Sequence, residues 1–190
     1  MGFIRKSIAL ILVKCRVLKY DVLSECQNVN GKPQKNQPLL LTGNGKISFG
    51  TNCKFGYKNS PFFYSFYTYV EARTVDAEII FGNNNHFNNN CRIEANTKIE
   101  FGNDVLVGVN CSFLDNDGHN LERDKRKSGV PNAAPIYIGN NVFIGDNVTI
   151  LKGVSIGDNS VIGNGSIVTK SIPSNVIAVG NPATVIRELN

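Results

Sequence analysis

The sequence predicts an all-β fold, a parallel β-helix assembled from hexapeptides, with a short N-terminal helix and one extruded loop. The main evidence lies in residues 136–170, where an aliphatic side chain recurs at every sixth position: Ile138, Ile144, Ile150, Ile156, Ile162 and Val168. A period of six fits neither an α-helix nor the simple alternation of a two-faced sheet, and it is typical of a solenoid. Glycine, asparagine and aspartate fall between these positions, where corners require left-handed backbone angles.

Residues 1–25 predict a separate helical segment. Apolar side chains recur at helical spacing across residues 3–20: Ile4, Ile8, Ile11, Cys15 and Leu18. Basic side chains are interleaved with them: Arg5, Lys6, Lys14, Arg16 and Lys19. Such an amphipathic basic helix can lie on an anionic membrane surface. We expect instead that its apolar stripe packs on the end of the β-helix or on a neighbouring subunit. Residues 26–45, rich in Asn, Gly and Pro, are expected to form a linker and an entry turn.

Four copies of one rung place the β-helix at residues 45–182, followed by a tail at 183–190. The copies read ISFG, IIFG, IEFG and IYIG and begin at Ile47, Ile79, Ile99 and Ile136. Three cysteines follow in a shared Asn-Cys-x-apolar pattern: Cys53, Cys91 and Cys111. We expect them to be small buried hydrophobes and not zinc ligands or disulfides. The aromatic cluster at 62–69 is expected to pack in a core or subunit contact, although stacking on a sugar ring is the alternative.

Composition narrows the function classes. Because no apolar run reaches 18 residues, a membrane span is not expected, and the chain is predicted to be cytoplasmic. A net charge of +5 suits an anionic cofactor, but the basic residues are too scattered for a nucleic-acid surface.

The repeat fails at two places, which are candidates for function. At the first, Asn85 replaces a small apolar inward residue. The second is the predicted loop at 115–135, and His119 lies near its start, close in sequence to Asp115 and Asp117. A histidine can take a proton from a hydroxyl near neutral pH, and a carboxylate can fix its tautomer. The sequence leaves open which of the two aspartates does so.

Residues 79–190 resemble the hexapeptide-repeat acyltransferases, particularly the galactoside, maltose and polysaccharide O-acetyltransferases. The resemblance is carried by three phrases: IGNNVFIGDNV at 138–148, GVSIGDNSVIGNGSIVTKSIP at 153–173 and VGNPATVIREL at 179–189. It implies a left-handed parallel β-helix and a homotrimer with active sites between adjacent subunits. It also implies direct transfer of an acetyl group from acetyl-CoA to a hydroxyl, without an acyl-enzyme.

The resemblance also assigns roles on the acceptor side. His119 matches the family's catalytic histidine, which deprotonates the acceptor hydroxyl. Asn88 best matches the acceptor-binding asparagine, in a run of asparagines that starts near Asn85. Phe143 stands where many members have a tryptophan beside the acceptor. Backbone N–H groups near Gly145 are expected to meet the oxyanion.

On the donor side, the resemblance places Thr169 and Lys170 along the CoA arm and Arg187 near the CoA phosphates. Two cations suit an anionic cofactor, although a solvated face is the alternative. Asn164 replaces a frequent alanine in the CoA channel, Asp146 follows Gly145 where a small neutral residue is common, and Thr184 replaces a phosphate-binding arginine of some members.

We therefore expect an acetyl-CoA-dependent O-acetyltransferase that acts on a sugar hydroxyl in surface-polysaccharide biosynthesis. The alternatives are acetylation of an antibiotic hydroxyl or an amino-sugar amine, and a catalytically silent β-helix scaffold, which Asp146 and Asn164 would favour. No metal is expected, because a β-helix carbonic anhydrase needs three zinc-binding histidines and this chain has two.

Overall fold

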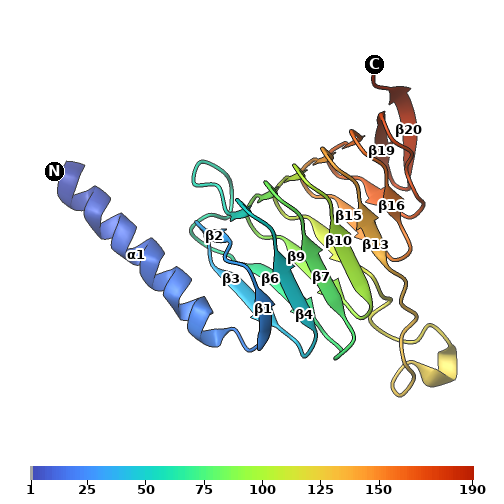
Figure 1. Cartoon of the computed structure of the whole chain (residues 1–190), viewed down its shortest axis with the longest axis horizontal. Coiled ribbons are helices and arrows are strands. Elements are labelled where there is room, and N and C mark those ends of the chain that lie inside the picture. The colour runs from blue at the N-terminus through green and yellow to red at the C-terminus, as the bar shows by residue number, and fades with distance from the viewer. Residues whose placement is uncertain (1) are drawn as a thin grey trace.

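The computed structural model describes residues 2–190 and shows the predicted left-handed parallel β-helix, a prism with three sheets as its sides (Figure 1). Successive coils stack in register, so that Ile99 lies between Ile79 of the previous coil and Ile136 of the next. Each coil thus places one strand in every sheet, and equivalent residues of all coils share one side of the prism.

Three sheets make up the prism. The first contains β1 (Asn28–Asn30), β4 (Lys46–Phe49), β7 (Glu78–Phe81), β10 (Lys98–Phe101), β13 (Ile136–Ile138) and β16 (Ser155–Ile156). The second contains β2 (Gln34–Lys35), β5 (Lys54–Phe55), β8 (His86–Phe87), β11 (Leu106–Val107), β14 (Phe143–Ile144), β17 (Val161–Ile162), β19 (Val176–Gly180) and β20 (Ala183–Glu188). The third contains β3 (Leu39–Thr42), β6 (Thr68–Ala72), β9 (Arg92–Ala95), β12 (Ser112–Leu114), β15 (Thr149–Leu151) and β18 (Ile167–Val168).

The core of the prism is a set of side-chain columns. In the N-terminal coils the rings of Phe49, Phe81 and Phe101 stack face to face, with centroids 4.8 and 5.1 Å apart. Isoleucines take over in the later coils, where Ile144 and Ile150 are fully buried. The predicted inward cysteines, Cys53, Cys91 and Cys111, are confirmed as buried free thiols.

Asparagines form the turns between sheets, as predicted. Asn84, Asn110 and Asn147 have φ angles of 57–58°, which asparagine tolerates better than most residues. Their side chains also bond from coil to coil, for example Asn110 Nδ2 to Asn147 Oδ1 at 2.9 Å. The corner polar groups are therefore paired along the prism axis.

The solenoid starts earlier than predicted. The segment at 26–45 forms a complete coil of β1, β2 and β3, which pair with β4, β5 and β6. The linker prediction is wrong because Leu39 and Leu41 supply inward apolar positions and are buried. At the other end, the tail folds back as β20, antiparallel to β19.

The N-terminal helix α1 (Gly2–Leu23) extends away from the N-terminal end of the prism (Figure 1). In residues 2–190, no helix is both long and apolar enough to pass through a bilayer. The predicted stripe does not pack on this chain, because Ile4, Ile11 and Leu18 are all more than half exposed. Another face of α1 makes the contacts, through Arg16 and Tyr20.

Candidate functional site

The extruded loop leaves the prism where the third sheet turns into the first, between β12 and β13. We call this corner the loop edge. His119 lies exposed at the start of the loop, and its Nδ1 is 3.3 Å from the carbonyl oxygen of Arg126. Because a carbonyl only accepts hydrogen bonds, Nδ1 of the neutral ring carries the proton, and Nε2 keeps its lone pair. This is the tautomer that a general base requires.

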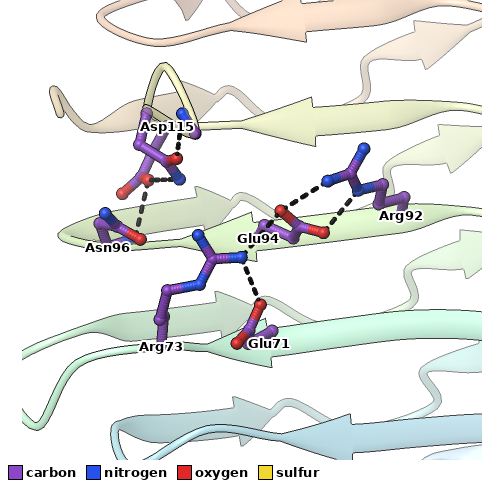
Figure 2. A network of polar contacts seen from close by, with 8 residues as sticks. Glu71, Arg73, Arg92, Glu94, Asn96 and Asp115 are labelled. Atoms are coloured by element: carbon purple, nitrogen blue, oxygen red, sulfur yellow. Dashed lines mark hydrogen bonds and ion pairs between the residues drawn. The ribbon is translucent and has the colours of Figure 1, made fainter. Parts of the chain in front are cut away.

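Asp115 does not orient His119. Its carboxylate is fully buried and accepts hydrogen bonds from the backbone N–H groups of Asn96, Thr97 and Lys98 at 2.7, 2.6 and 3.0 Å. Figure 2 shows Asp115 turned toward the β9–β10 corner. The prediction of a catalytic role for Asp115 is therefore corrected, since it closes a turn of the preceding coil.

Asp117 also has a partner other than the histidine. Its carboxylate forms an ion pair with Lys152, which follows β15 in the next coil. Because Asp117 is mostly buried and Lys152 belongs to the prism, the pair ties the root of the loop to the β-helix. Sequence reasoning missed Lys152, since a lysine 35 residues away carries no local signal. The carbonyl of Arg126 thus takes the position that the sequence assigned to an aspartate.

A second polar network lies beside the loop root and was not predicted. Glu94 on β9 is only 8% exposed and forms ion pairs with Arg92 and Arg73, and Arg73 also pairs with Glu71 (Figure 2). Hydrogen bonds that Arg73 donates to Glu71 and Arg92 donates to Glu94 raise the pKa of both guanidinium groups. This network could not be predicted from the sequence, because charged side chains that point outward from a strand usually remain solvated.

The predicted donor-side residues divide between two places. Thr169 and Lys170 follow β18 and lie exposed on the loop edge, two coils beyond His119. Arg187 lies on β20, at the C-terminal end of the second sheet. Among residues 2–190, neither Lys170 nor Arg187 has an acidic partner, so both cations can meet an anionic ligand.

The predicted acceptor residues meet in a different part of the prism. A cavity of about 570 Å³ lies on the second sheet and is lined by Asn88, Phe143, His86 and Asp146, among others. Nε2 of His86 is buried there without a hydrogen-bond partner, and burial, followed by the charge of Lys54, lowers the pKa of His86. The cavity thus combines an apolar ring with polar side chains, as a small-molecule site requires.

Asn85 does not reach this cavity. Its side chain is fully buried inside the coil, where Nδ2 donates to the Gly102 carbonyl at 3.0 Å and Oδ1 accepts from the Val105 N–H at 2.9 Å. The acceptor-binding prediction for Asn85 is corrected, because its amide satisfies the backbone of the next coil.

The turn from the second sheet to the third, the acceptor edge, explains two of the departures noted above. Oδ1 of Asp146 accepts from the Val109 N–H at 2.8 Å, and Oδ1 of Asn164 accepts from the Asp146 N–H at 2.9 Å. Each side chain therefore stacks on the coil before it. A Cβ at Gly145 would lie 2.1 Å from Oδ1 of Asn164, so this position requires glycine.

The oxyanion prediction at Gly145 is also corrected. The Gly145 N–H already donates to the Ile162 carbonyl at 2.8 Å, and the Asp146 N–H is held by Asn164. Neither group is free to receive an oxyanion.

The predicted donor-side and acceptor-side residues lie on opposite parts of one chain. His119, Thr169 and Lys170 lie on the loop edge, between the third and first sheets, whereas Asn88 and Phe143 lie on the second sheet or its acceptor edge. In a three-sided prism, the loop edge is the corner opposite the second sheet. Within residues 2–190, no cluster of three His, Cys, Asp or Glu side chains could hold a metal ion.

A family model and the sequences of known proteins point to the same family for this chain. Residues 135–170 match the family model described as bacterial transferase hexapeptide (six repeats). A galactoside O-acetyltransferase of Lactococcus lactis is 36% identical over 89% of this chain and 76% of its own length. That of Escherichia coli is 41% identical over 60% of this chain, and the match spans 56% of the relative's length.

Solved structures agree with these sequences. A galactoside acetyltransferase in complex with coenzyme A is similar with a TM-score of 0.56 and 30% identity, covering 94% of this chain and 82% of that one. A maltose O-acetyltransferase from Clostridium difficile 630 gives 0.56 and 28%, covering 97% and 84%. The L. lactis match extends over most of both sequences, and the solved structures share the prism. The chain accordingly belongs to the hexapeptide-repeat acetyltransferases.

Proposed function

We propose that the protein is an acetyl-CoA-dependent O-acetyltransferase in which His119 is the general base and a sugar hydroxyl is the acceptor. The observation that carries this proposal is the state of His119, which is exposed at the loop root with Nδ1 facing the Arg126 carbonyl. The relatives named as galactoside and maltose O-acetyltransferases support a sugar acceptor. We place the activity in surface-polysaccharide biosynthesis in the cytoplasm, where buried free thiols are stable.

The proposed reaction is a direct transfer. Nε2 of His119 accepts the proton of the acceptor hydroxyl as the oxygen attacks the thioester carbonyl of acetyl-CoA. The carbon–sulfur bond then breaks, and the imidazolium returns its proton to the departing thiolate. The Arg126 carbonyl, bonded to the Nδ1 proton, stabilises the ring orientation and the positive charge that forms. A general base of this kind contributes about 10²–10⁴-fold in rate.

Residues of the loop edge and of the second sheet would together hold acetyl-CoA, the acetyl donor. Lys170 and Arg187 are the proposed partners of the CoA phosphates, and Thr169 and Asn164 would line its arm along with the backbone at Gly145. Both cations are exposed and have no acidic partner among the described residues. Replacing Lys170 and Arg187 with glutamine should weaken CoA binding in a titration while leaving the thermal unfolding midpoint of the free protein unchanged.

We further propose that a homotrimer completes the active site. The opposed positions of His119 and the Asn88 cavity on one prism support an arrangement in which the loop edge of one copy faces the second sheet of its neighbour. A closed cyclic assembly repeats this contact around its axis.

Subunit complementation tests this arrangement. His119→Ala and Asn88→Ala should each be inactive, whereas co-expressed chains that mix at random should recover about a quarter of the wild-type sites, because mixed trimers hold one intact pair each. Failure to recover activity in mixed trimers verified by mass would show that both residues act from one chain, contrary to the proposal.

The reaction class is tested by thiol release from acetyl-CoA with a panel of mono- and oligosaccharides. Release that depends on one sugar, with formation of its O-acetyl ester by mass spectrometry, is the expected result. If acetyl-CoA binds but no hydroxyl acceptor is acetylated while an amino sugar is, the acceptor class in the proposal is wrong.

A further inference from the structure

One face of the helix α1 packs against the rest of the chain. The guanidinium of Arg16 donates to the carbonyl oxygens of Phe63 and Phe66, each at 2.9 Å, and the ring of Tyr20 lies 4.6 Å from that of Tyr67. These contacts anchor the helix to the 57–67 segment of the second coil. The aliphatic side chains on the opposite face of α1 remain exposed.

The opposite face is a continuous apolar stripe. Its residues follow one another four and three positions apart, which keeps them on one side of a helix. They are Ile4, Ile8, Ile11, Cys15, Leu18 and Val22. The exposed fraction of the five aliphatic side chains ranges from 52% for Ile8 to 77% for Val22. Leu12, beside the stripe, is 61% exposed as well. A helix of a stable monomer rarely leaves so much apolar surface in water.

The charges around the stripe are of one sign. Between residues 2 and 20 the helix carries five basic residues and no acidic one, which equals the net charge of the whole chain. The acidic residue that follows, Asp21, is already paired with Lys35. Lys14 flanks one side of the stripe, and Arg5 and Lys19 flank the other. Long basic side chains in these positions can reach outward while the aliphatic residues are buried.

We propose that α1 binds the surface of an anionic lipid bilayer, with this stripe in the interface and its basic residues on the headgroups. An apolar stripe flanked by cations matches the two components of such a surface. Self-association of the helix fits less well. In a parallel coiled coil, the flanking positions of neighbouring helices would place Lys14 against Lys19, and no acidic residue between 2 and 20 offsets the repulsion. The inference does not depend on the proposed acetyl transfer.

Vesicle flotation of the full chain tests the proposal. We expect binding to vesicles of phosphatidylcholine in which about one lipid in three is phosphatidylglycerol, and weak or no binding to phosphatidylcholine alone. Ile4→Ser with Ile11→Ser should reduce binding at least tenfold, and Val75→Ser, an exposed aliphatic residue outside α1, is the matched control. Lys14→Gln with Lys19→Gln should reduce binding about tenfold or more, with Arg123→Gln and Lys127→Gln in the exposed loop as the control.

Two results would overturn the proposal. One is equal binding to anionic and neutral vesicles, or none to either. The other is wild-type vesicle binding by the stripe variant. Sedimentation of the same samples measures their oligomeric mass. A stripe variant that loses subunits, in a protein that does not float with anionic vesicles, would assign the stripe to a contact between copies instead.

Discussion

Replacement of Asp115 tests whether its carboxylate stabilises the fold or takes part in catalysis. In Asp115→Ala, the backbone N–H groups of Asn96, Thr97 and Lys98 lose their acceptor inside the protein. A buried unsatisfied donor costs about 1–3 kcal/mol, so three of them, partly relieved by relaxation, should lower the free energy of unfolding by about 4 kcal/mol. Asp117→Asn is the matched comparison, because Asp117 forms one partly exposed ion pair, with Lys152, and its loss should cost about 1 kcal/mol.

Urea denaturation followed by far-UV circular dichroism measures both values. Activity of Asp115→Asn, assayed well below its unfolding midpoint, should keep the wild-type dependence of kcat/KM on pH, since Asp115 does not contact His119. A loss of stability below 1 kcal/mol combined with a shift in that pH dependence would show that Asp115 does orient the histidine, and would refute this assignment.

Three further predictions follow from the core, the cavity and the thiols. Phe81→Ala removes the middle ring of the phenylalanine stack and should cost about 3–5 kcal/mol in urea denaturation, against little change for the exposed Tyr64→Ala. Burial lowers the pKa of His86, so the unfolded chain binds more protons than the folded protein below about pH 6.5, and the free energy of unfolding should fall there. His86→Gln should lose less of this free energy between pH 7.5 and 5.5 than the wild type does. An equal loss would show that His86 is not responsible. Of the five cysteines, exposed Cys15 should react first with a thiol reagent, and Cys15→Ser should abolish this fast phase.

Much of the fold could be predicted because nearly every coil carries the same hexapeptide pattern. The six-residue period predicts which side chains point inward, and the same positions point inward in each coil. Ile138 and Cys111 were therefore both predicted correctly as buried. The first coil was missed because its inward residues, Val29, Leu39 and Leu41, lie among Asn, Gly and Pro and do not carry the rung motif.

The candidate site was less readable, because its contacts join residues of different coils. The sequence placed His119 at the loop root and offered Asp115 and Asp117 as its partners. In the structure these carboxylates bind the turn at 96–98 and Lys152, which lie one coil before and one coil after. The role of the Arg126 carbonyl could not be predicted, because any residue supplies a carbonyl. Likewise, Asn85 and Asn88 look equivalent in a run of asparagines, and only the coil geometry turns one inward and the other toward the cavity.

Acetyl transfer by His119→Ala, measured beside coenzyme A binding by the same sample, tests whether His119 is the general base. If His119 is the general base, transfer to the best sugar acceptor should fall about 10²–10⁴-fold, while the dissociation constant for coenzyme A changes less than about twofold. Transfer within tenfold of wild type would contradict the assignment of His119 as the general base. A loss of coenzyme A binding equal to the loss of transfer would contradict it as well, because the histidine would then bind the donor and not accept the proton.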